Sequence, residues 1–185
     1  MTRGLVTASA LLGLALAPGA GAQPSPVVLD GTFAMQGTVT TAIHIKGEHR
    51  GERIRRTWLF RSSCGQTACQ AVDLFRLRGS RQSSDIVLLR RTGPIEYTGH
   101  SHFWVSLYCA HRLRPHGGRA SETIGVHVLH AALVNGTWYA TSIRATYVNP
   151  RRVNRTRCPG GIGHDAAAYA GTLASPLPGP VTATS

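Results

Sequence analysis

The sequence contains few acidic residues and almost no lysine. Eight Asp and Glu stand against twenty Lys and Arg in 185 residues, and Lys46 is the only lysine, so the formal charge is +12. No spacing of these eight carboxylates indicates the paired acids of a glycosidase. The arginine excess has two interpretations: it serves binding to a polyanion, or it reflects the codon bias of a GC-rich genome, which the abundant Ala, Gly and Pro share.

The sequence also lacks the local motifs that mark common enzyme classes. It has no H-E-x-x-H zinc motif, no phosphate-binding loop and no dinucleotide fingerprint. Ser101 lies between two histidines and follows Gly99, but the closing glycine of a nucleophile elbow is missing. These absences favour a protein without catalytic activity and without a cofactor.

An apolar run lies at the N-terminus, between a basic residue and a group of small residues. Arg3 precedes it, it extends from Leu5 to Ala17, and Ala20-Gly21-Ala22 follows, which is the pattern of a secretory signal peptide. The run is too short for a transmembrane helix, which needs about 20 apolar residues. We therefore expect residues 1–22 to be cleaved. Without Arg3 the formal charge falls from +12 to +11, and the mature chain, with no membrane span, is expected to be secreted and extracellular.

Four cysteines follow the expected leader: Cys64, Cys69, Cys109 and Cys158. In an oxidising compartment we expect two disulfide bonds, and four cysteines allow three pairings. We favour Cys64 with Cys69, which closes a small polar loop, and Cys109 with Cys158, which ties a strand to a distant segment. The C-x4-C spacing matches neither a zinc knuckle nor a redox motif, so the cysteines are expected to be structural.

Turn residues recur along the chain, and the segments between them alternate between apolar and polar residues with period two. The Asn135-Gly136 pair predicts a type I′ hairpin between two such segments. Pro115-His116-Gly117-Gly118 predicts a turn, and Asn149-Pro150 predicts the end of a strand. The segment from Asp165 allows either a short capped helix or a strand, and we favour the strand. The predicted strands cover residues 32–45, 53–61, 71–78, 85–91, 95–112, 123–134, 137–148 and 165–174, with a bend in the fifth at Gly99.

These eight segments predict one all-β domain over residues 23–174, an antiparallel meander followed by a disordered tail over 175–185. We favour a closed β-barrel over a two-sheet sandwich, because closure removes the exposed edges of a meander. Gly31-Thr32-Phe33 resembles the G-x-W motif that opens lipocalins, with phenylalanine in place of tryptophan and without the later family motifs. The resemblance implies a lipocalin-like shape and no membership of that family.

The meander brings the start of the second predicted strand near the end of the third, and both are rich in arginine. Like charges across strands are destabilising. The cluster therefore splays into solvent, pairs with Glu48, Glu52 and Asp85, or binds an anion through its guanidinium groups. The residues of this candidate anion site are Arg53, Arg55, Arg56, Arg76, Arg78 and Arg81.

His100 and His102 form the candidate metal site. Residues i and i+2 of a strand point to the same face, where two imidazoles can chelate one ion. A third ligand could come from His127 or His130, and surface histidines without metal are the alternative. Trp104 and Tyr108 have the same parity, so this face could line a cavity mouth or pack in the core.

Together these observations predict a secreted, disulfide-bonded, non-catalytic β-domain. It would bind a small apolar ligand inside a barrel, or a polyanionic envelope surface through its arginines. The alternatives are a metal-dependent extracellular hydrolase that uses His100 and His102, and a purely structural envelope protein. Nucleic acid is not an expected partner, because the leader directs the chain out of the cell.

Overall fold

The computed structural model describes residues 26–45, 47–64, 68–77, 85–109, 111–154, 156 and 163–177. These residues form strands and connecting turns, and no helix among them is long and apolar enough to cross a membrane. The eight strands are β1 (Gly31–Ile43), β2 (Arg53–Ser62), β3 (Ala71–Leu77), β4 (Ile86–Arg91), β5 (Glu96–Cys109), β6 (Arg112–Val134), β7 (Thr137–Asn154) and β8 (His164–Leu173).

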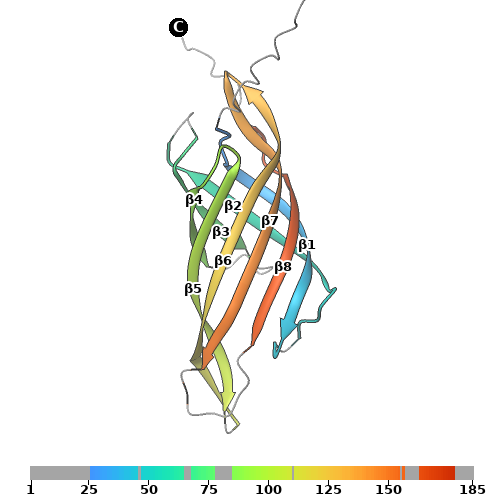
Figure 1. The fold of residues 1–185 in the computed structure, drawn as a ribbon, viewed down its shortest axis with the longest axis vertical. Helices are drawn as coiled ribbons and strands as arrows, with labels where there is room; N and C mark the ends of the chain where they lie inside the picture. Colours follow the sequence, from blue (N-terminus) through green and yellow to red (C-terminus); the bar gives the residue numbers. More distant parts are fainter. Residues whose placement is uncertain are drawn as a thin grey trace, which may run out of the picture.

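Each strand pairs antiparallel with the next, and β8 returns to pair with β1 (Figure 1). The predicted all-β antiparallel meander is therefore confirmed, as one ring-like sheet. The Ala-rich segment that could have capped a helix is strand β8, because β1 and β7 provide hydrogen-bond partners on both of its edges. The predicted turn at Asn135-Gly136 joins β6 to β7, and both residues have the positive φ of a type I′ turn.

Two predicted breaks between strands were wrong, and both had been placed at a proline. The expected turn at 115–118 lies inside β6, where one residue of β5, Ser106, faces the three residues Pro115, His116 and Gly117. The expected strand end at Asn149-Pro150 lies inside β7, in an irregularity of its pairing with β6. Proline has no backbone N–H for the ladder, and strands accept it at such bulges.

The irregularity in the long fifth strand also lies at another position than predicted. Its register shift lies between Val105 and Leu107 rather than at Gly99, and it turns into β6 after Cys109. At Gly99 a Cβ would collide with the side chains of Val87 and Leu89 on β4. The glycine therefore allows a close approach of two strands.

One end of the ring is packed with large side chains. Phe33, Trp58, Phe60, Leu74 and Leu89 are almost completely buried there, and Phe33 meets Phe60 edge to face at 5.3 Å. The segment before β1 covers this end: Val28 forms a bridge to Tyr139 of β7, and the Tyr97 hydroxyl donates to the Val27 carbonyl at 2.8 Å. This is the closed end of the ring. At the opposite end, called the open end below, β1, β3, β5 and β7 finish.

One predicted disulfide bond is present. Cys64 and Cys69 are bonded, with 5.4 Å between their Cα atoms. The second predicted bond stays a prediction, because Cys158 lies outside the described residues. The expected leader, Arg78, Arg81 and residues 178–185 also lie outside them.

Candidate functional site

A cavity of about 550 Å³ occupies the open half of the ring. Because alternate residues of each strand point inward, its wall combines side chains from six strands and from the loop after β1. The wall has an apolar and aromatic part and a charged part. The first includes Val39, Ile54, Trp58, Phe103, Tyr147 and Tyr169, and the second includes Glu48, Glu52, Arg56, Arg76, Asp85, Arg152 and Asp165.

Arg76 on β3 is paired with two carboxylates inside the ring. Its Nη2 donates to Asp85 Oδ2 at 3.0 Å and to Glu122 Oε2 at 2.6 Å, and the Glu122 side chain is completely buried. The guanidinium group also lies over the Tyr147 ring, 5.1 Å from its centroid. One guanidinium group therefore holds two carboxylates together inside the ring.

Arg152 on β7 forms a second group with Asp165 on β8. Its Nη2 donates to Asp165 Oδ1 at 3.0 Å, and the buried Asn149 amide donates to the same oxygen at 2.7 Å. The Arg152 guanidinium lies 6.0 Å from the centroid of the Phe103 ring. This group is neutral in charge, and its guanidinium, like that of Arg76, covers one aromatic face of the cavity.

Glu48 is a carboxylate of the cavity wall on which the charges of Arg152 and Arg56 act without direct contact. Its carboxylate has no hydrogen bond or ion pair with any described residue. Burial raises the pKa of Glu48, the negative charge of Asp165 raises it further, and the charge of Arg152 partly opposes both. The pKa values of Tyr147 and Tyr169 are also raised by burial, so both phenol groups remain protonated donors.

Acidic side chains gather in the open half of the ring, in a protein of formal charge +12. Among the residues that the structure describes, five of the eight acidic residues lie there with three guanidinium groups. The carboxylates are those of Glu48, Glu52, Asp85, Glu122 and Asp165, and the guanidinium groups are those of Arg56, Arg76 and Arg152. Such a site favours a cationic group over an anionic one.

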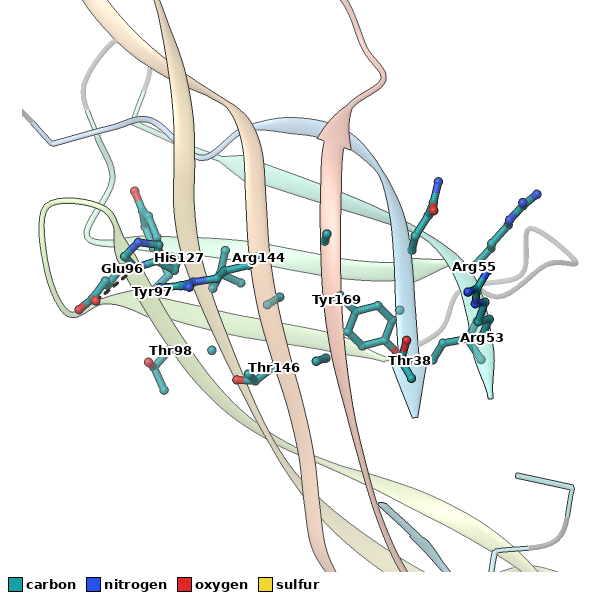
Figure 2. Close-up of a pocket in the computed structure, with 18 of the residues that line it drawn as sticks. Thr38, Arg53, Arg55, Glu96, Tyr97, Thr98, His127, Arg144, Thr146 and Tyr169 are labelled. Atoms are coloured by element: carbon teal, nitrogen blue, oxygen red, sulfur yellow. Dashed lines mark hydrogen bonds and ion pairs between the residues drawn. The ribbon is translucent and has the colours of Figure 1, made fainter. Parts of the chain in front are cut away.

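The outer face of the ring carries a groove of about 1110 Å³ (Figure 2), and Ile54 and Tyr169 line both this groove and the cavity. It follows two adjacent rows of cross-strand partners, one per strand from β5 through β6, β7, β8 and β1 to β2. The first row is Glu96, His127, Arg144, Ala170, Gln36 and Arg55, and the second is Thr98, Gly125, Thr146, Ala168, Thr38 and Arg53. Five strand spacings make each row about 24 Å long. Small residues, Gly125, Ala168 and Ala170, line the middle of the groove between the larger side chains at its ends.

The strands divide the predicted anion site between two faces. Arg53 and Arg55 point outward and lie at one end of the groove, opposite Glu96 and His127 in Figure 2. Arg56 and Arg76 point inward and line the cavity. Arg76 forms the ion pair with Asp85 that the sequence allowed as an alternative. The described arginines thus do not converge on one anion.

The two histidines of the candidate metal site lie together on the outer face. His100 Nδ1 is 2.9 Å from Thr123 Oγ1, and His102 Nδ1 is 3.2 Å from Ser121 Oγ. His127 lies farther along β6 and contacts Glu96 at 3.3 Å. Among the residues that the structure describes, no three His, Cys, Asp or Glu side chains could hold a metal ion together.

Several cavity residues were missed in the sequence. Glu122 has the same parity as the buried Ile124 and Val126, and Asp165 has the same parity as the buried Ala167. An acidic residue at an inward position of a strand is the signal that could have found both. Glu48 was considered only as an ion-pair partner of the arginine cluster, and because it lies in a loop no strand parity marks it as a cavity residue.

Comparison with protein-family models, with curated proteins and with solved structures finds no significant match for this chain. The cavity, the groove and their chemistry therefore carry the functional argument.

Proposed function

We propose that this protein is a secreted, non-catalytic binding protein whose ring of strands acts as a closed β-barrel and holds a small ligand in its open half. The ligand combines an apolar body with a cationic group. The observation that carries the proposal is the gathering of carboxylates, Glu48 among them, in a cavity with aromatic walls, where they outnumber the guanidinium groups of the described residues. Its volume lies within the range of about 300–1,000 Å³ that is usual for small-molecule sites.

The charged part of the wall argues against the purely apolar ligand that the sequence predicted. A purely apolar molecule would remove water from several carboxylates and guanidinium groups without replacing their hydrogen bonds, which is unfavourable. An anionic ligand would be repelled by Glu48, which forms no ion pair with a described residue, and would have to displace the carboxylates that already occupy Arg76. A cation avoids both costs, because it neutralises Glu48 where burial already disfavours the bare charge.

The aromatic part of the wall accommodates the apolar body. Trp58 and Tyr169 lie against one another, with ring centroids 5.1 Å apart, at the inner end of the cavity. Arg76 and Arg152 already cover the rings of Tyr147 and Phe103. The ligand's apolar body is therefore expected against Trp58 and Tyr169, with its cation toward Glu48.

A matched pair of probes tests this proposal. We expect 2-naphthylethylamine to bind in calorimetry at low salt and the isosteric naphthyl carboxylate to bind at least tenfold more weakly. Glu48→Gln should remove most of this preference, whereas Glu96→Gln, which changes an exposed carboxylate on the outer face, should leave it unchanged. Equal binding of the two probes, binding of neither, or the same effect from both variants would refute the proposal.

Secretion is tested separately. Expression of the full chain in a host with a general secretory pathway should release a protein whose N-terminus is Gln23 by mass spectrometry. Retention of residues 1–22 in the exported protein would contradict this part of the proposal.

A further inference from the structure

The hairpin formed by the end of β5 and the start of β6 projects beyond the ring at its open end. In Figure 1 it extends past the ends of β1, β7 and β8. Among the described residues, the pairs from Leu107 with Arg114 to Cys109 with Arg112 have no third strand beside them, since the pairing of β6 with β7 begins at Gly118. The described residues of this segment, 104–109 and 111–119, are called the basic hairpin below.

Large apolar side chains of the basic hairpin are exposed on one face. Trp104 is 53 % exposed, Tyr108 is 76 % exposed and Leu113 is 55 % exposed. Tyr108 and Leu113 are direct cross-strand partners, and Trp104 has the same outward parity as Tyr108. The Trp104 ring contacts the His116 ring edge-on at 5.3 Å. The hairpin therefore presents an aromatic and aliphatic surface to solvent.

The same hairpin is strongly cationic. Arg112, Arg114 and Arg119 are all exposed, and the sequence from residue 97 to residue 121 contains no acidic residue. Exposed Trp, Tyr and Leu combined with Arg are typical of segments that lie in the interface of an anionic bilayer, where aromatic rings sit at headgroup level and cations contact phosphates.

We propose that the basic hairpin docks the open end of this protein on an anionic lipid bilayer. A soluble polyanion would engage the arginines and leave the exposed Trp104, Tyr108 and Leu113 in water. A bilayer interface satisfies both kinds of side chain. The basic hairpin borders the cavity, since Trp104, Val105 and Ser106 also line it. The charged side chains proposed to bind the cavity ligand lie outside the hairpin, so the two proposals can fail separately.

The chain contains its own control at the opposite end. The β6–β7 hairpin also exposes apolar residues, with Leu133 56 % exposed and its cross-strand partner Trp138 40 % exposed. No Asp, Glu, Lys or Arg occurs from residue 128 to residue 143. The β6–β7 hairpin thus exposes apolar side chains as the basic hairpin does, but it has no cationic side chains. We therefore expect no electrostatic attraction between it and an anionic lipid surface.

Tryptophan fluorescence can locate the contact. The chain has three tryptophans, and Trp58 is buried. In a Trp138→Phe variant, vesicles of mixed phosphatidylglycerol and phosphatidylcholine should shift the Trp104 emission to shorter wavelength, and brominated acyl chains should quench it. In a Trp104→Phe variant, the same vesicles should leave Trp138 unchanged. A shift of Trp138 alone, or no shift in either variant at low salt, would overturn the proposal.

Vesicle partitioning measures the contribution of the charges. Each arginine near an anionic surface contributes about 1 kcal/mol, so the double variant Arg112→Gln, Arg114→Gln should partition about 25-fold more weakly. The matched pair Arg53→Gln, Arg144→Gln on the outer face of the ring should change partitioning less than threefold. Equal losses in the two pairs would show general electrostatic attraction and overturn the assignment to the hairpin.

The apolar side chains separate a bilayer from a soluble polyanion. Tyr108→Ser with Leu113→Ser should weaken vesicle partitioning at least tenfold and leave melting temperature unchanged, because the hairpin tip lies outside the ring. Leu133→Ser with Trp138→Ser should not weaken it. Tight binding to polyphosphate together with unchanged vesicle partitioning of the serine variant would refute a lipid partner.

Discussion

Replacement of Arg76 by methionine should destabilise this protein strongly. Methionine fills much of the volume of the arginine stem but provides no charge. Arg76 contacts Asp85 at 3.0 Å and Glu122 at 2.6 Å, and only 14 % of its side chain is exposed. Without the guanidinium group, two carboxylates lie close together inside the ring, and the completely buried one, Glu122, loses its contact with Arg76.

The structure sets the size of this effect. Removal of one partner from a buried ion pair costs about 3–5 kcal/mol, because the other charge remains buried without compensation. We expect the upper part of this range, since Glu122 is completely buried. Asp85 should contribute less, because 24 % of its side chain is exposed and water can solvate it.

The double variant Arg76→Met, Glu122→Met separates charge from packing. Apolar replacement of both partners of a buried ion pair is often neutral or stabilising. We therefore expect the free energy of unfolding, measured in urea at neutral pH, to be several kcal/mol lower for the single variant than for the natural protein. The double variant should recover most of this loss. A single variant as stable as the natural protein, or a double variant less stable than the single one, would refute this account of the interior.

Three further predictions concern other parts of the fold. Because burial raises the pKa of Glu48 above its ordinary value of 4.5, the folded state loses stability as pH rises through that raised pKa. In thermal unfolding, Glu48→Gln should therefore be more stable than the natural protein at neutral pH and equally stable below pH 4.5. A variant less stable than the natural protein at neutral pH would contradict burial as the cause. Replacement of Cys64 and Cys69 by serine should lower the free energy of unfolding by about 2 kcal/mol in urea, since the closed loop is short, and an unchanged value would show that the bond constrains nothing. Gly37→Ala should cost about 1–3 kcal/mol in the same assay, because the added methyl group meets the Tyr169 ring, and no loss would mean that the ring moves aside freely.

The strands of this fold were predictable because period-two alternation is a local property of the sequence. The hairpin at Asn135-Gly136 needs only its own two residues, which accept positive φ. The bulges at Pro115 and Pro150 were not predictable, because a neighbouring strand must tolerate the missing donor and the sequence does not show which strand that is.

The candidate site was less predictable than the fold. Arg55 and Arg56 are neighbours in sequence, and strand geometry sends them to opposite faces. Arg76 and Glu122 are 46 residues apart, and their contact depends on how the ring closes and on the relative register of its strands. Glu48 lies in a loop whose position over the cavity follows from no local pattern.

The distribution of charge is the strongest argument that the open half of the ring has a function. Acidic residues would stabilise a chain of charge +12 most easily if they were spread among its exposed arginines, where they would cost no desolvation. Five of the eight lie inside instead, and burial makes the ionised form of at least one of them, Glu48, unfavourable. Folding alone does not require this arrangement, since apolar side chains fill the closed half of the same ring and bury their surface at no electrostatic cost. Natural sequences keep such unfavourable groups where binding needs them. Glu48 should therefore be the residue at which stability and ligand affinity change in opposite directions.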